Sequence, residues 1–180
     1  MAHSIFTIGH STHTIDRFVE LLWDHKIGVL ADVRIHPGSR RLPQFNQLEL
    51  DEALAAESIR YEHFKELGGR RRPQPDTPNT GWETEAFRGY ADHMESDEFA
   101  AGLERLLALA GEKRTAVMCA EALWWRCHRR LLSDALLVRG WNVRHIGADG
   151  HLSEHRLTPF AVADGVHVRY PPAQQSLNLP

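Results

Sequence analysis

Short β-rich runs alternate with amphipathic segments along most of the chain. Residues 4–8 and 29–33 are runs of closely spaced apolar side chains, as in buried strands. Between them, Ile15, Phe18 and Leu22 recur at the spacing of one helix face. The alternation continues to about residue 146. It predicts an α/β protein with an open, mainly parallel sheet of about five strands flanked by helices.

At 180 residues the chain has the length of one domain. Asp164 and Gly165 separate two later β-rich runs, which is a strong signal for a β-hairpin. We therefore expect a single α/β domain over residues 1–170 with a C-terminal hairpin, and a loosely held tail over 171–180. The other predicted elements are strands at 59–64, 115–119 and 142–146 and helices at 46–56, 83–94, 97–110 and 122–139.

The segment 67–81 contains three prolines and a Gly-Gly pair, which leave no room for regular structure. A loop of about 15 residues inside a compact domain is commonly functional or disordered. We expect this loop either to fold over a binding pocket or to be the most mobile internal segment.

Hydrophobic residues make up 42% of the chain and charged residues 25%, which is typical of soluble globular proteins. The longest apolar run, 106–110, is far too short to cross a bilayer, and residues 1–11 lack the apolar core of a signal peptide. These features predict a cytoplasmic protein with no membrane partner. They carry no signal for an oligomeric state.

The formal net charge of −3 argues against nucleic-acid binding through bulk charge. Of the 21 cationic residues 18 are arginines, whose planar guanidinium groups suit bidentate recognition of phosphate or carboxylate. Codon bias would produce the same excess. The arginines are therefore informative only where they gather at one site.

Polar side chains follow every strand of the predicted sheet. Ligands of open parallel sheets bind at the carboxyl ends of the strands, so we expect these side chains to converge. A phosphate-like anion is the expected occupant, held in one pocket by Arg34, Arg40, Cys119 and Glu121. The residues that follow the strands are His10, Ser11, Arg34, Arg40, Arg70, Cys119, Glu121 and His145.

Cys119 lies where a predicted strand turns into a predicted helix. Backbone N–H groups and the helix dipole at such a turn lower the pKa of a thiol and bind anions, as in cysteine-dependent phosphatases and rhodanese-like sulfurtransferases. The spacing from Cys119 to Arg126 is one residue longer than in the phosphatase loop, which leaves the reaction open. Cys127 falls on the apolar stripe of the same helix, so we expect it to be buried and inert. Glu121 is the candidate general acid or base.

A metal ion is the alternative occupant of this edge. Residues 151–155 have H-x-x-x-H spacing but no helical pattern, and we expect them to form a solvated loop. The other histidines and the cysteines lack the tight spacing of metal motifs, so we expect neither a metal nor a cofactor. The group that would hold a metal is His10, Cys119, Glu121, His128 and His145.

Six ordered motifs span residues 4–155. They are Thr7-Ile8-Gly9-His10-Ser11, Asp32-Val33-Arg34 with Pro37, Ser39 and Arg40, Leu67-Gly68-Gly69-Arg70, Phe87-Arg88-Gly89-Tyr90-Ala91, Met118-Cys119-Ala120-Glu121 and Cys127-His128-Arg129. Together they resemble the DUF488 family. The resemblance implies a compact bacterial or archaeal α/β domain without an assigned reaction. It implies a shared polar site made of His10, Ser11, Arg34, Arg40, Arg70, Cys119, Glu121, His128 and Arg129.

The sequence thus predicts binding of a small anionic or nucleotide-like ligand in a pocket lined by arginine, cysteine and glutamate, with turnover left open. Two alternatives stay open as well. One is an accessory protein that binds or processes nucleic acid through the same arginines, which a steep salt dependence would indicate. The other is a non-catalytic interaction module, which the absence of a concave pocket would favour.

Overall fold

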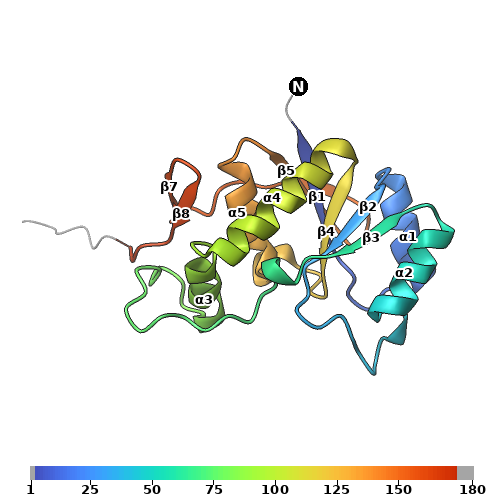
Figure 1. The fold of residues 1–180 in the computed structure, drawn as a ribbon, viewed down its shortest axis with the longest axis horizontal. Helices are drawn as coiled ribbons and strands as arrows, with labels where there is room; N and C mark the ends of the chain where they lie inside the picture. Colours follow the sequence, from blue (N-terminus) through green and yellow to red (C-terminus); the bar gives the residue numbers. More distant parts are fainter. Residues whose placement is uncertain (1–2, 174–180) are drawn as a thin grey trace, which may run out of the picture.

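The computed structural model describes residues 3–173, and a six-stranded sheet forms its centre (Figure 1). The strand order is β3-β2-β4-β1-β5-β6, in which β1 to β5 run parallel and β6 pairs antiparallel to β5. The strands are β1 (Ser4–Gly9), β2 (Val29–Asp32), β3 (Arg60–His63), β4 (Thr115–Cys119), β5 (Asn142–Ile146) and β6 (Leu152–Glu154). The α/β class and the mainly parallel sheet predicted from the sequence are confirmed.

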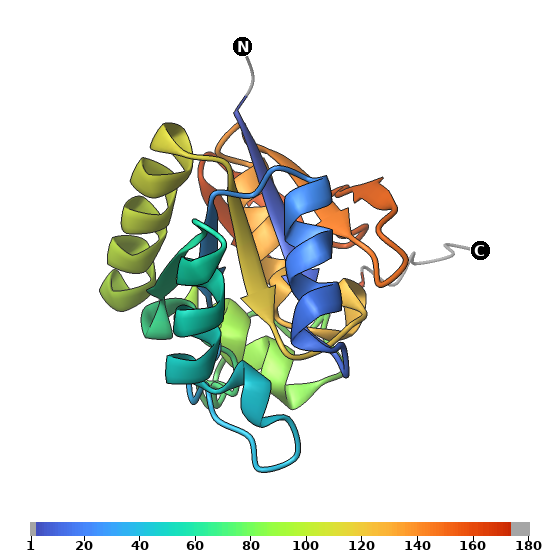
Figure 2. The same cartoon turned by 90° about the vertical axis from the view of Figure 1, so that its right-hand side faces the viewer.

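Helices cover both faces of the sheet, because successive strand residues point to opposite sides. Phe6 and Ile8 pack with α1 and α2, which Figure 2 shows in front of the sheet, whereas Ile5 packs with α3, α4 and α5 on the other face. The helices are α1 (Ile15–Asp24), α2 (Gln47–Ala56), α3 (Glu85–His93), α4 (Asp97–Glu112) and α5 (Arg129–Leu137), with short 3-10 turns at Pro43–Phe45, Lys65–Leu67 and Trp124–Arg126.

The neighbouring strands β1 and β4 send the chain to opposite faces of the sheet. After β1 it enters α1 on one face, and after β4 it reaches α5 on the other. Such a reversal opens a crevice beyond the carboxyl ends of the two strands, where open α/β sheets bind ligands. Gly9 ends β1 at this point, and a Cβ atom there would overlap the carbonyl group of Glu121. The glycine lets the loop after β4 lie directly against β1.

The predicted helix at 122–139 begins later than the periodicity indicated, since α5 starts only at Arg129. The residues before it are held in a loop by their own polar groups. The Glu121 carboxylate accepts a hydrogen bond from the backbone N–H of Leu123 at 3.2 Å. The Arg129 guanidinium donates to the carbonyl groups of Glu121 and Ala122, which are therefore satisfied outside a helix. Cys119 consequently does not lie at a helix N-terminus.

The predicted solvated loop at 151–155 is also wrong. Its residues Leu152–Glu154 form the edge strand β6, and the backbone N–H of His155 donates to the carbonyl of Val143 at 2.8 Å. His155 is buried as a result. The three exposed residues Leu-Ser-Glu carry no alternating pattern that could indicate a strand.

The predicted hairpin around Asp164 and Gly165 is confirmed by β7 (Val162–Asp164) and β8 (His167–Arg169), which pair antiparallel. Of the predicted tail, residues 174–180 lie outside the described residues, and 171–173 have no regular structure. Within residues 3–173 no helix combines the length and the apolar character that a membrane crossing requires.

Candidate functional site

A cavity of about 380 Å³ opens at the carboxyl ends of β1, β2 and β4. Each strand contributes a residue at or just after its end, namely His10, Arg34 and Cys119. Parts of the loop after β2, together with Gly69, Arg70, Ala120 and His128, complete the wall. The lining residues are His10, Arg34, Ile35, His36, Gly38, Ser39, Leu42, Gly69, Arg70, Cys119, Ala120 and His128. The predicted convergence of strand ends thus forms a concave pocket.

Arg34 is fixed by an ion pair with Asp32, the last residue of β2. Its Nε donates to Asp32 Oδ1 at 2.9 Å and its Nη2 to Oδ2 at 2.6 Å, while the Tyr61 hydroxyl donates to Oδ2 at 2.7 Å. Asp32 is completely buried and Arg34 is 8% exposed. Burial works to lower the pKa of Arg34, but the bonds to the Asp32 carboxylate raise it above its usual value. Arg34 therefore presents a charged group of fixed orientation at the cavity wall.

His10 is held in one neutral tautomer beside this pair. Its Nδ1–H donates to the carbonyl of Ser11 at 2.8 Å, which leaves Nε2 as an acceptor facing Arg34 Nη1 at 3.3 Å. The ring stacks on Phe45 with centroids 4.3 Å apart. Burial lowers the pKa of His10 to about 4, and the charge on Arg34 acts in the same direction. His10 thus contributes no charge to the cavity at neutral pH.

The loop after β2 is shaped by Asn46, the residue that precedes α2. Its side chain does not cap the helix but accepts a hydrogen bond from the backbone N–H of Ser39 at 2.6 Å. Ser39 Oγ in turn accepts from the backbone N–H groups of Arg41 and Leu42, both at 3.2 Å. These bonds hold one wall of the cavity open.

Gly69 and Arg70 form the opposite wall. A Cβ atom on Gly69 would lie 2.7 Å from Nδ1 of His128, so only glycine allows the imidazole to pack there. Arg70 has a φ of +58°, and its side chain is exposed at the cavity. Two residues of the predicted loop 67–81 therefore line the cavity.

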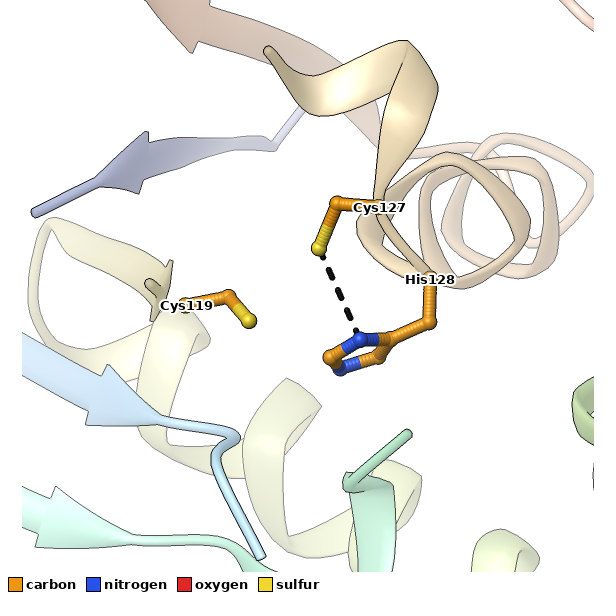
Figure 3. A group of neighbouring side chains, drawn as sticks. All are labelled: Cys119, Cys127 and His128. Atoms are coloured by element: carbon orange, nitrogen blue, oxygen red, sulfur yellow. Dashed lines mark hydrogen bonds between the residues drawn. The ribbon is translucent and has the colours of Figure 1, made fainter. Parts of the chain in front are cut away.

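Cys119, Cys127 and His128 form a compact group at the floor of the cavity (Figure 3). The two sulfur atoms and one imidazole nitrogen all lie within 4.8 Å of one another. Cys127 Sγ and His128 Nδ1 are 3.5 Å apart, and the backbone N–H of Arg129 points to Cys127 Sγ at the same distance. Cys119 and His128 line the cavity, whereas Cys127 lies behind them and is 5% exposed.

The two cysteines form a buried pair whose pKa values shift in opposite directions. The neighbouring Cys127 sulfur, together with burial, raises the pKa of the Cys119 thiol. The neighbouring Cys119 lowers the pKa of Cys127, against the effect of burial, and His128 and Arg129 act in the same direction as Cys119. The premise that Cys119 lies at a helix N-terminus is wrong, because α5 begins at Arg129, which places Cys127 beside the first backbone N–H groups of the helix.

Arg129 is the largest fully buried side chain, at 1% exposed. Its Nη1 donates to Thr7 Oγ1 at 3.4 Å, its Nη2 contacts two carbonyl groups, and its Nε has no hydrogen-bond partner among the described residues. No carboxylate within the described part of the chain forms an ion pair with it. Arg129 therefore supports the cavity floor from behind and does not line the cavity.

Three other predicted residues lie outside the cavity lining. Ser11 contributes its backbone, with a φ of +46° and an N–H that donates to the Ala120 carbonyl at 3.0 Å. Arg40 is exposed on the loop after β2. Glu121 is exposed and caps its own loop. Of the four residues expected to line one pocket together, the structure joins Arg34 and Cys119 but neither Arg40 nor Glu121.

His145 belongs to a second, buried network and not to the cavity. Thr7 Oγ1 lies 2.7 Å from His145 Nδ1, and His145 Nε2 lies 3.0 Å from His155 Nδ1. His155 Nε2 donates to Asp134 Oδ1 at 2.8 Å. The metal group considered from the sequence is therefore not assembled. Sequence reasoning did not include Cys127 among the candidate metal ligands. Its position directly before His128, another residue type that binds metals, was the available signal.

The mainly parallel sheet and the polar cavity at the carboxyl ends of β1 and β4 define an α/β protein with a candidate site at its strand ends. The family model described as "Domain of unknown function DUF488" matches residues 14–136, and the chain belongs to this family. The matched span includes Arg34, Arg70 and the Cys119–Arg129 region, but not His10. No curated protein and no solved structure gives a significant match.

Proposed function

We propose that the protein binds a small anionic ligand, such as a phosphate ester or nucleotide, in the cavity at the ends of β1, β2 and β4. The observation that carries this proposal is the composition of the wall. The described residues that line it include two arginines and three histidines and no acidic side chain. A cavity of about 380 Å³ lies at the lower end of the range for small-molecule sites.

The two arginines have different parts in the binding. The charge of Arg34 is largely offset by Asp32, so Arg34 provides directed N–H donors more than net charge. Arg70 forms no side-chain hydrogen bond or ion pair with the described residues and reaches the cavity from an exposed loop. Arg70 supplies the net positive charge that draws in an anion.

Turnover by Cys119 and Glu121 has less support than binding. The neighbouring Cys127 and burial raise the pKa of the Cys119 thiol, and only thiolates are strong nucleophiles. Glu121 caps a loop outside the cavity lining. The proposed function is therefore binding, and any chemistry on the bound anion requires a further group.

Titration calorimetry with inorganic phosphate and with adenosine monophosphate tests the proposal. Arg70→Ala removes one charge-assisted contact, worth about 1.5 to 3 kcal/mol, and should weaken binding by roughly 10- to 100-fold. The matched control is Arg40→Ala, an exposed loop arginine outside the lining, which should change the dissociation constant less than about twofold.

The same experiment separates the alternatives. A single-stranded oligonucleotide that binds more tightly than either small anion, with a log-log salt slope of several units, would replace the proposal with nucleic-acid binding. Equal losses in Arg70→Ala and Arg40→Ala, or no heat with either anion at millimolar concentration, would overturn it in favour of an interaction module.

A further inference from the structure

We propose that Cys119, Cys127 and His128 form a zinc site in the floor of the cavity, with one coordination position open to the ligand. Two thiolates and an imidazole are the side chains that Zn²⁺ prefers in proteins. Three protein ligands with a free fourth position are the arrangement of reactive zinc sites, whereas purely structural sites use four. The sequence contains no recognisable metal motif here, because seven residues separate the two cysteines and His128 follows a turn.

The distances fit tetrahedral coordination. Bonds of about 2.3 Å to sulfur and about 2.05 Å to nitrogen place a sulfur and a nitrogen ligand roughly 3.6 Å apart, and two sulfurs roughly 3.8 Å apart. Cys127 Sγ and His128 Nδ1 are 3.5 Å apart, and all three candidate ligand atoms lie within 4.8 Å. Figure 3 shows both thiols and the imidazole pointing toward one another. Small side-chain rotations bring the three atoms to one ion.

The ligands are held by rigid parts of the fold. Cys119 ends the central strand β4, while Cys127 and His128 immediately precede α5. Gly69 and Tyr90 fix the His128 ring, the first by close packing and the second with ring centroids 5.0 Å apart. A site whose ligands are already positioned loses little conformational entropy when the metal binds.

The charges of the two cysteines in their thiolate form also favour a divalent ion at this place. Two sulfur atoms this close together repel when both are thiolates, unless a cation lies between them. The Arg129 backbone N–H supports Cys127 Sγ at 3.5 Å, as expected of an outer contact to a metal thiolate. A divalent ion would balance the two negative charges of the thiolates. The positive charge of buried Arg129 would then remain to attract an anion in the cavity.

The fourth position faces the cavity, because two of the three ligands line it. The anion would coordinate the metal there, and only this last step rests on the proposed function. A bound Zn²⁺ would then act as a Lewis acid on a phosphoryl or carbonyl oxygen. It would supply the reactive group that Cys119 and Glu121 lack.

The test is a titration of the reduced, metal-free full chain with Co²⁺, followed by displacement with Zn²⁺. We expect one equivalent of cobalt to bind, with a thiolate-to-cobalt charge-transfer band and intense ligand-field bands of four-coordination. Cys127→Ser and His128→Asn should each weaken binding by more than the roughly 10- to 100-fold that loss of an outer contact costs. His151→Asn, an exposed histidine outside the group, is the control and should bind as the wild type does.

A readout on the unaltered protein guards against variants that fail to fold. One equivalent of Zn²⁺ should protect both cysteines of the wild type from iodoacetamide, as located by mass spectrometry. Weak octahedral cobalt spectra without a charge-transfer band, or unprotected cysteines at saturating Zn²⁺, would overturn the site.

The two proposals can fail separately. Arg70→Ala should leave cobalt binding intact, and Cys127→Ser should leave phosphate binding to the metal-free protein intact. Cobalt binding without any anion binding would remove the proposed function and keep the metal site, whereas the opposite result would remove the metal site alone.

Discussion

Two buried polar networks lie on either side of Arg129, and they differ in whether their polar atoms are satisfied. On one side, hydrogen bonds run without a break from Arg129 through Thr7, His145 and His155 to Asp134. On the other side, His128 Nε2 at the cavity and Arg129 Nε behind its floor are buried without a hydrogen-bond partner among the described residues.

The difference separates a structural cluster from a site. Asp134 is fully buried and accepts from His155, from the Thr158 backbone at 3.0 Å and from the Tyr170 hydroxyl at 2.8 Å. Nothing in that network is left for a ligand. The cavity side is polar, concave and incompletely paired, which is the state expected of a site that completes its bonds with a bound molecule.

The largest effect should come from breaking the closed network. Asp134→Ala leaves three buried donors unpaired, and we expect the free energy of unfolding to fall by about 4 kcal/mol, as measured by urea denaturation. The control is Asp149→Ala, an exposed carboxylate that accepts only the His151 backbone N–H, with a loss below about 0.5 kcal/mol. A loss below about 1 kcal/mol in Asp134→Ala would contradict a structural role for the network.

Breaking the Asp32–Arg34 ion pair at the cavity should lower the free energy of unfolding slightly less, and a bound anion should restore part of the loss. Asp32→Asn removes the charge that offsets Arg34, and we expect a loss of about 3 kcal/mol in the free energy of unfolding. Phosphate should restore part of this stability, because the uncompensated Arg34 binds the anion more tightly. Urea denaturation with and without phosphate measures it. Equal stabilisation of the variant and the wild type by phosphate would contradict this account.

Acid should weaken the closed network in a graded way. Burial lowers the pKa of His145 to about 2, and the neighbouring His155 and Arg129 add to the shift. Below pH 6.5 the unfolded chain binds a proton at this position that the folded protein does not. The stabilising contribution of neutral His145 is therefore fully present above about pH 6.5. It is lost as the pH falls toward 2, by up to about 1.4 kcal/mol per pH unit.

Urea denaturation between pH 4.5 and 7 measures the contribution of His145. His145→Gln should remove a slope of stability against pH that grows from near zero at pH 7 to about 1.4 kcal/mol per unit below about pH 5.5. An unchanged slope would show that His145 is not the group that resists protonation in the folded protein.

The smallest effect concerns the packing of His128. Gly69→Ala pushes a Cβ atom against the imidazole, and we expect a loss of about 1 kcal/mol in stability together with weaker cobalt binding. Gly111→Ala is the matched control, because nothing lies within 4 Å of its Cβ position in α4. That variant should gain about 0.5 to 1 kcal/mol through helix propensity and bind cobalt normally. Equal behaviour of the two variants would mean that Gly69 does not position the ring.

Local sequence signals predicted most of the fold. Four of the five parallel strands, β1, β2, β4 and β5, bury at least two apolar side chains each, and their apolar runs predicted them. The hairpin was predicted because Asp164-Gly165 suits a tight turn without help from the rest of the chain. The edge strand β6 was missed, since three exposed residues acquire strand geometry only by pairing with β5.

The same division holds within the candidate site. His10, Arg34, Arg70, Cys119 and His128 were predicted because they belong to motifs at strand ends or before a helix, and they line the cavity. Arg40 and Glu121 lie close to them along the chain, yet the loop geometry turns both outward. Proximity along the sequence does not determine the direction of a side chain in a loop.

What the sequence determined by itself is the order of elements, the family and the residues that follow each strand, because periodicity, turn chemistry and motifs are local properties. What only the tertiary structure decided is the strand order and the grouping of Cys119 with Cys127. The start of α5 depends on Arg129 binding the carbonyl groups of the preceding loop, and Gly9 allows that loop to approach β1. These are contacts between distant segments, and their energies appear only when the chain is folded.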